Sequence, residues 1–91
     1  MQFMVIERFR NHDARAIYRR LRERGRMMPE GLTYVSSWVA ADLGPCFQLM
    51  EADDVTLFQH WIASWSDLME FEVVPVVPGA TTAEALAGQL D

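Results

Sequence analysis

The sequence predicts an α+β domain of the ferredoxin-like class, with elements in the order β-α-β-β-α-β. Two amphipathic helical segments alternate with extended segments in that order, and a Gly-Pro turn joins the two middle strands into a hairpin. A chain of 91 residues has the size of one domain. We therefore expect a four-stranded antiparallel sheet, in strand order 4-1-3-2, with two helices on one face.

The first half of this order begins with residues 2–9 (QFMVIERF), whose β-branched and aromatic residues predict a strand. The apolar stripe of a helix follows at spacing i, i+3, i+4 and i+7: Ala14, Ile17, Tyr18 and Leu21. Asn11 or Asp13 can cap the start of this helix. Gly25 suits a left-handed cap at its end.

The second half begins with a predicted hairpin, in which residues 32–40 and 46–51 are strands and DLGP (42–45) is the turn. Asp53 or Asp54 can cap the helix that follows. Its apolar residues recur at helical spacing and form a stronger stripe than that of the first helix: Val55, Phe58, Trp61, Ile62, Trp65 and Leu68.

The last predicted strand covers residues 71–77 and contains Pro75. Because proline cannot donate to a hydrogen-bond ladder, we expect this strand at a sheet edge. Residues 1–77 then form a single ferredoxin-like domain. Residues 78–91 form a C-terminal tail, which either contains a short helix from Thr82 onward or stays mobile.

The predicted strands are apolar on both faces. The following apolar residues lie on one face of their strands, while equally apolar residues lie on the other face: Met4, Ile6, Tyr34, Trp38, Cys46, Met50, Val74 and Val76. A ferredoxin-like monomer leaves one sheet face in water, and so apolar a face exceeds the few hundred Å² that a monomer usually exposes. We expect a homodimer through this open sheet face, since a two-fold interface uses one patch twice.

Four segments resemble a bacterial domain-of-unknown-function family: FMVIERF (3–9), residues 25–38, SSWVAADLGPCFQLMEADD (36–54) and WSDLMEFEVVPVV (65–77). Its members are small proteins with a dimeric α/β-barrel fold, in which two ferredoxin-like subunits join sheet to sheet. The resemblance covers about residues 1–77 and leaves out the tail. It implies the fold and the dimer. It implies no activity, because the family has no assigned reaction or catalytic residues.

The charges are divided along the chain. All eight basic residues are arginines and lie in residues 1–26, which carry a net +5, whereas residues 27–91 carry a net −10. One flank of the first helix is a candidate contact for an anionic ligand or an acidic partner: Arg15, Arg19 and Arg22. The alternative is a solvated face complemented by acids of the same dimer. A pI of about 4.9 argues against nucleic-acid binding.

The composition also argues against a disordered, membrane-spanning or secreted protein. With 51% hydrophobic and 23% charged residues, the chain is too apolar to be disordered, and no apolar run approaches the ~20 residues of a membrane-spanning helix. The single cysteine, Cys46, excludes an internal disulfide and fits the cytoplasm. Met1 is followed directly by strand-like sequence, so we expect no secretory signal.

The aromatic residues suggest either an ordinary core or a ligand pocket between the sheet and the helices. The candidate lining consists of Glu7, Ser36, Trp38, Gln48, His60, Trp61 and Trp65. In dimeric α/β-barrel enzymes this cleft holds substrates, including those of monooxygenases of aromatic compounds and of haem. The order of Asn, Trp and His in the haem-degrading members does not occur in this chain.

Other constellations favour structural roles. Glu70 or Glu72 is expected to pair with Arg8 across neighbouring strands. His60, Ser64 and Asp67 follow helical spacing, but a serine in mid-helix lacks the exposed turn and oxyanion donors of a nucleophile, so these residues predict a polar face.

Cys46 follows Pro45 in a strand, which predicts a small core residue and not a nucleophile. No metal-ligand spacing is present, and we expect neither a metal nor a cofactor.

Two functions follow from these patterns. The first is a small homodimeric binding or interaction module without catalysis. The alternative is a cofactor-independent enzyme, similar to a monooxygenase or an isomerase, which acts on a small hydrophobic or aromatic substrate in the sheet–helix cleft. A cleft filled by tryptophans argues against the enzyme, whereas an open apolar cavity that meets Glu7, Gln48 or His60 favours it.

Overall fold

The computed structural model describes residues 1–91 and contains one antiparallel sheet of four strands, in the order β2-β3-β1-β4. The strands are β1 (Gln2–Phe9), β2 (Thr33–Val39), β3 (Cys46–Glu51) and β4 (Met69–Val76). The predicted α+β class and the four-stranded antiparallel sheet are confirmed. Read from the other edge, the order is β4-β1-β3-β2. As its proline requires, β4 is an edge strand.

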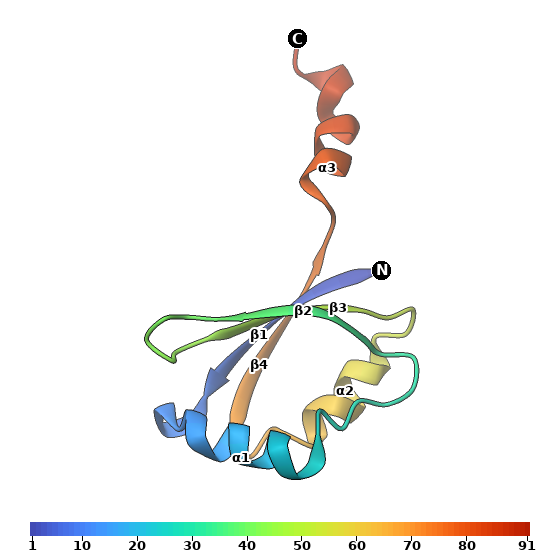
Figure 1. Cartoon of the computed structure of the whole chain (residues 1–91). Coiled ribbons are helices and arrows are strands. Elements are labelled where there is room, and N and C mark those ends of the chain that lie inside the picture. Colours follow the sequence, from blue (N-terminus) through green and yellow to red (C-terminus); the bar gives the residue numbers. More distant parts are fainter.

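Two helices, α1 (Ala14–Arg24) and α2 (Thr56–Ala63), lie on the same face of the sheet (Figure 1). A short 3₁₀ turn, η1 (Arg10–His12), leads into α1. Asp13 caps α1, since its Oδ1 accepts a hydrogen bond of 3.2 Å from the Ala16 N–H. Gly25 ends α1 with φ +68°, a conformation that glycine adopts without strain.

The second helix is shorter than its apolar stripe. Asp54 Oδ1 accepts a hydrogen bond of 2.9 Å from the Thr56 N–H at its start. The helix ends at Ala63, and the remaining apolar residues, Trp65 and Leu68, lie in the turns that lead to β4.

None of the helices in the structure is long and apolar enough to span a membrane.

The C-terminal tail forms a third helix, α3 (Gly79–Leu86), and a 3₁₀ turn, η2 (Ala87–Gln89). The helix begins three residues earlier than the expected start at Thr82, directly after Pro78. Figure 1 shows α3 extending away from the sheet on the side opposite α1 and α2. It buries none of its residues against the rest of the chain.

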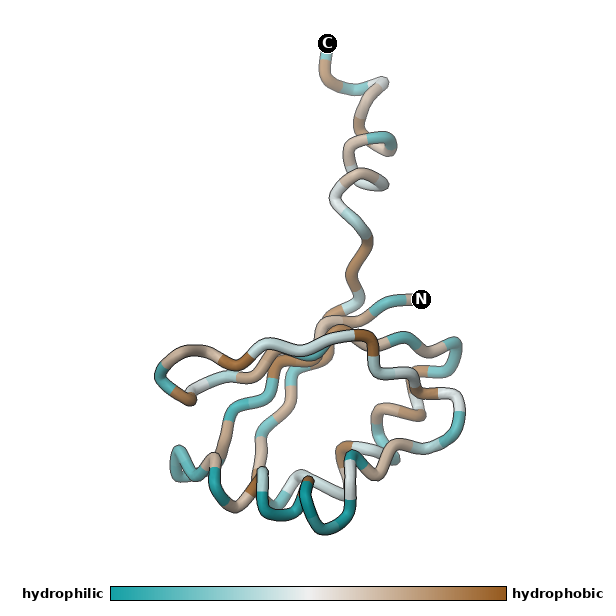
Figure 2. Tube along the Cα trace, viewed as in Figure 1, coloured by the Kyte–Doolittle hydropathy of each residue, from teal (hydrophilic) through white to brown (hydrophobic).

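The hydrophobic core fills the space between the sheet and the two helices. Its buried residues include Val5, Met50 and Trp61, each at most 2% exposed. Phe3 and Phe58 meet edge to face, with ring centroids 4.8 Å apart, and thereby join β1 to α2. The outer side of α1 is strongly hydrophilic (Figure 2), so this helix packs only by its inner stripe.

The other face of the sheet is also apolar, as predicted, and no segment of the chain covers it (Figure 1). Six apolar residues alternate with the core residues of β1, β3 and β4 and are only partly buried: Met4, Ile6, Phe47, Leu49, Val74 and Val76.

A β-bulge in β2 shifts the register between Tyr34 and Ser36. Tyr34 is therefore paired with Met50 on the helix side, whereas Trp38 is paired with Phe47 on the open side, where it is 54% exposed. A regular strand would have placed Tyr34 and Trp38 on one face.

Candidate functional site

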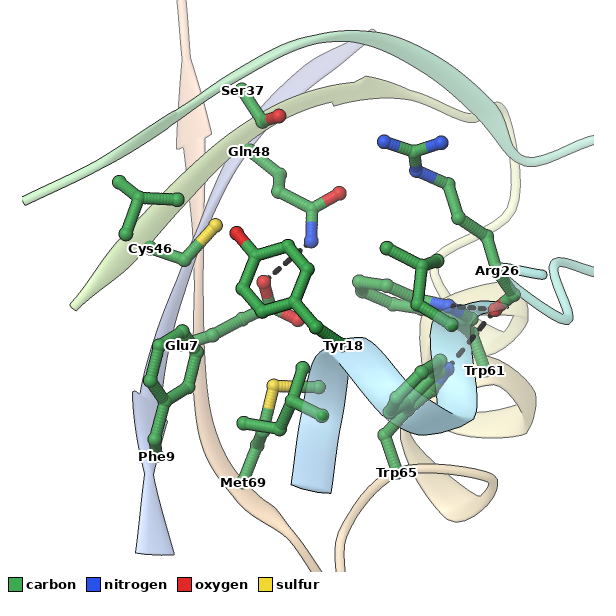
Figure 3. A pocket seen from close by; sticks show the side chains of 13 residues that line it. Glu7, Phe9, Tyr18, Arg26, Ser37, Cys46, Gln48, Trp61, Trp65 and Met69 are labelled. Atoms are coloured by element: carbon green, nitrogen blue, oxygen red, sulfur yellow. Dashed lines mark hydrogen bonds between the residues drawn. The ribbon is translucent and has the colours of Figure 1, made fainter. Parts of the chain in front are cut away.

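A cavity of about 160 Å³ lies between the helix side of the sheet and the two packed helices. Figure 3 shows its lining, which is mostly apolar. The thirteen lining residues are Glu7, Phe9, Ile17, Tyr18, Leu21, Arg26, Ser37, Val39, Cys46, Gln48, Trp61, Trp65 and Met69. An apolar cavity that meets a few convergent polar groups has the character of a small-molecule site.

Two buried polar side chains meet inside this cavity. Glu7 on β1 is 2% exposed and Gln48 on β3 is 9% exposed. The Gln48 Nε2 group donates a hydrogen bond to Glu7 Oε1 (Figure 3). Glu7 Oε2 and Gln48 Oε1 are also buried, but neither has a hydrogen-bond partner in the protein. Such atoms are costly unless something else satisfies them.

The environment of Glu7 favours its neutral form. Burial raises the pKa of the Glu7 carboxyl group and outweighs the opposing effects of the Gln48 hydrogen bond, the neighbouring Cys46 thiol and the Arg26 charge. In its protonated form, a carboxyl group in an apolar site can donate a hydrogen bond or a proton to a bound molecule.

Cys46 lines the same cavity as an inert thiol. Its side chain is buried, and burial together with the neighbouring Glu7 raises the pKa of the thiol to about 12. Because the thiolate and not the thiol is the nucleophile, Cys46 is not prepared for covalent chemistry. It belongs to the core, as its position in a strand predicts.

The two tryptophans form one wall and hold the backbone of a third residue. The indole N–H groups of Trp61 and Trp65 both donate to the Arg26 carbonyl oxygen, at 2.9 Å and 3.0 Å. The Arg26 guanidinium lies over the Tyr34 ring, with its central carbon 3.8 Å from the ring centroid. It forms no ion pair with any carboxylate of the chain.

Tyr18 of α1 lies between this cavity and the outer surface. It is 47% exposed, and it lines both the cavity and a shallow depression on α1. The other residues of the depression are the three arginines predicted as an anion contact: Arg15, Arg19 and Arg22. None of the three forms an ion pair within the chain.

The structure brings together four of the seven residues predicted to line a pocket. These are Glu7, Gln48, Trp61 and Trp65. The other three, Ser36, Trp38 and His60, do not line the cavity.

These three residues are missing from the cavity lining for two different reasons. The bulge in β2 brings Ser37, opposite Gln48, into the lining, whereas Ser36 is paired with Leu49 on the open side together with Trp38. His60 is exposed on α2. No sequence pattern indicated Arg26, because only the tertiary structure brings the loop after α1 next to the tryptophans.

The remaining polar constellations serve the fold. Arg8 Nη1 lies 3.4 Å from Glu72 Oε1, which confirms the predicted ion pair between β1 and β4. The Asp67 carboxylate accepts two hydrogen bonds of 2.7 Å from Arg20 and is therefore engaged away from His60. No group of three His, Cys, Asp or Glu side chains in the structure could hold a metal ion.

The profile of a protein family described as a domain of unknown function, DUF3303, matches residues 1–90. The chain belongs to this family. The match confirms the predicted resemblance to a family of unknown function and extends it through α3, which the resemblance had left out. No curated protein and no solved structure matches the chain. The DUF3303 family supplies no reaction, so function must be argued from the cavity.

Proposed function

We propose that the protein is a homodimeric binding module that takes up one small, mainly apolar molecule between the sheet and the helices. The observation that carries this proposal is the pair of unpartnered buried oxygens, Glu7 Oε2 and Gln48 Oε1, in an apolar cavity. A ligand that hydrogen-bonds to both would remove the cost of leaving them unpaired.

The size of the cavity limits the ligand. Its volume of about 160 Å³ is close to that of an engineered apolar cavity of ~150 Å³ that binds benzene. The ligand is therefore about the size of a single aromatic ring with one or two substituents. The indole walls of Trp61 and Trp65 suit such a ring.

The polar pair limits the chemistry of the ligand. In its protonated form, which burial favours, Glu7 offers an O–H donor, and Gln48 Oε1 offers an acceptor next to it. A hydroxyl group both accepts and donates, so it satisfies both atoms at once. Phenol is the simplest probe with this combination.

The dimer follows from the open face of the sheet. The uncovered residues, with Trp38 among the most exposed, form an apolar surface on the side opposite α1 and α2. A second copy seated there sheet to sheet would give the dimeric α/β-barrel arrangement of two ferredoxin-like subunits. The single unpaired Cys46 fits a bacterial protein of the cytoplasm.

Calorimetric titration with phenol tests the binding function. We expect saturable binding, weaker binding of toluene because it lacks the hydroxyl group, and loss of phenol binding in Val39→Trp. Val39 lines the cavity from edge strand β2 and is 37% exposed, so a larger side chain can enter the cavity without displacing the core. Val55→Trp is the matched control, because Val55 is 59% exposed and outside the cavity.

Phenol binding in the Val55→Trp control is expected to equal that of the wild type. Failure of the wild type to bind phenol or toluene would overturn the binding function. Equal binding by Val39→Trp would place the ligand elsewhere on the protein.

A second candidate function is isomerisation by proton transfer, which the Glu7 carboxyl group favours. Because its pKa is raised, the Glu7 carboxylate is a stronger base than an ordinary glutamate. In such a reaction the Glu7 carboxylate accepts a proton from a carbon next to a carbonyl group. The resulting acid returns the proton to another atom of the same molecule, so no oxidant or cofactor is required.

Proton exchange distinguishes the enzyme from the binding module. A small ketone with an aromatic ring, such as acetophenone, is incubated in D₂O and its methyl protons are followed by NMR. The enzyme predicts protein-dependent loss of the methyl signal, which Glu7→Gln abolishes although phenol still binds. Exchange at the same rate in Glu7→Gln would refute a role for Glu7 and leave the protein a binding module.

A further inference from the structure

One positively charged residue lines the cavity and has no ion-pair partner in the protein. Arg26 lines the cavity, and its guanidinium lies over the Tyr34 ring without a carboxylate partner. The one acid in the lining is Glu7, which forms no ion pair with Arg26 and whose pKa is raised by burial. No other charged side chain lines the cavity.

The position of Arg26 is built into the fold. Both indole N–H groups of the cavity wall are used to hold its carbonyl oxygen, and the Tyr34 ring supports its guanidinium. A side chain anchored in this way loses less conformational freedom when it binds a ligand. The planar guanidinium presents several N–H donors in a geometry that matches a carboxylate.

The depression that shares Tyr18 with the cavity, here called the entrance, carries the same sign of charge. Tyr18 separates the cavity from the depression lined by Arg15, Arg19 and Arg22, and these arginines have no acidic partners in the chain. A group of like charges at the mouth of a cavity raises the local concentration of oppositely charged ligands and accelerates their association. Arg26 inside and the three arginines outside thus favour the same class of ligand.

We infer that the natural ligand is a small aromatic hydroxy acid, whose carboxylate binds Arg26 while its hydroxyl group binds Glu7 and Gln48. This inference rests on the proposed binding function and adds the anionic group. The ring lies between these two polar ends, against Trp61 and Trp65. The arginines around Tyr18 attract the acid to the entrance.

Three probes of related shape test the inference in the intact protein: phenol, 4-hydroxybenzoate and its neutral amide, 4-hydroxybenzamide. Calorimetry at neutral pH should show that the acid binds at least about tenfold more tightly than the amide, as expected for a charge-assisted hydrogen bond. Phenol reports on the binding function alone. If phenol binds and the acid has no advantage over the amide, the ligand is not an acid and the inference fails.

Substitution of Arg26 locates the effect. Arg26→Gln should remove the preference for 4-hydroxybenzoate over its amide, whereas Arg26→Lys should retain part of this preference, since the charge remains but the planar donor geometry is lost. Arg24→Gln is the matched control, because Arg24 is exposed at the end of α1 and does not line the cavity. A preference for the acid that survives Arg26→Gln in a folded variant would overturn the role of Arg26.

Salt dependence gives a measurement that needs no variant. Binding of 4-hydroxybenzoate to the wild type should weaken as NaCl rises, whereas binding of phenol should not change, because screening acts only on the charged ligand.

Discussion

Gln48 Nε2 donates a hydrogen bond to Glu7 Oε1 across strands β3 and β1, and each side chain leaves its other oxygen buried without a partner. A pair of residues that served only the core would be expected to satisfy its polar atoms within the protein. Here the unsatisfied atoms lie in a cavity of which Trp61 and Trp65 form one wall. This relationship makes the sheet–helix space a candidate site and not merely a packing defect.

Replacement of Glu7 by glutamine should stabilise the protein at higher pH. Because burial raises the Glu7 pKa, the folded state binds this proton more tightly than the unfolded state. The free energy of unfolding of the wild type therefore falls as pH rises from the ordinary pKa of 4.5 through the raised value. The fall is ~1.4 kcal/mol for each pH unit between the two pKa values. Glu7→Gln has no proton to lose and avoids this decrease.

Urea titrations of wild type and Glu7→Gln between pH 4 and pH 8 measure this difference. The other groups that face Glu7 are Cys46, Tyr18 and Arg26, and all three are unchanged in the variant. Glu30→Gln, in the exposed loop before β2, controls for the loss of one negative charge. Parallel profiles for wild type and Glu7→Gln would show that Glu7 does not titrate with a raised pKa.

Trp38→Asp should convert the proposed dimer into monomers. Trp38 is 54% exposed on the open face of the sheet, and a charge there would lose its water when the second copy docks. Light scattering at micromolar concentration measures the change. Leu43→Asp is the control, since Leu43 is 56% exposed but lies in the turn between β2 and β3. A wild-type mass equal to one chain would refute the dimer.

Removal of the arginines at the entrance should slow the binding of acids. In the triple variant Arg15→Gln, Arg19→Gln, Arg22→Gln, stopped-flow tryptophan fluorescence should show at least about a tenfold lower association rate for 4-hydroxybenzoate at low salt. Dissociation should change little, because these side chains lie outside the cavity. An equal reduction for uncharged phenol would indicate a steric effect instead of an electrostatic one.

Deletion of residues 78–91 should leave the domain folded and the dimer weaker. Helix α3 buries no residue, so the circular dichroism of the sheet and phenol binding should persist in a chain of residues 1–77. The tail leaves on the side of the open face (Figure 1) and exposes Leu86 and Leu90, which a second copy can cover. Light scattering of a dilution series measures how readily the dimer dissociates. Loss of phenol binding in the chain of residues 1–77 would contradict the proposed domain limits.

Cys46 should resist alkylation in the folded protein. A pKa of about 12, against an ordinary value of 9.0, leaves about a thousandfold less thiolate at neutral pH. Labelling with iodoacetamide at pH 7.5, followed by mass spectrometry, should be correspondingly slower than in 6 M guanidinium chloride. Equal rates in the two conditions would show that the thiol is neither buried nor perturbed.

Much of the local structure was readable in the sequence. The strands at residues 2–9 and 46–51, the cap at Asp13 and the edge position of Pro75 each depend on interactions within a few residues or on the chemistry of one side chain. Periodicity likewise predicted the buried Ile17, Phe58 and Trp61, although Tyr18 and Val55 of the predicted stripes are exposed. The start of α3 and the length of α2 were less well predicted, because helix ends depend on weak, competing contacts.

The sequence by itself determined the order of the elements, the two apolar sheet faces and four residues of the cavity: Glu7, Gln48, Trp61 and Trp65. Only the tertiary structure decided the rest. The bulge in β2 exchanged Ser36 for Ser37, since one extra residue in a strand reverses the face of all that follow. Arg26 joined the site through the two indole N–H groups, a contact between distant segments that no local pattern encodes.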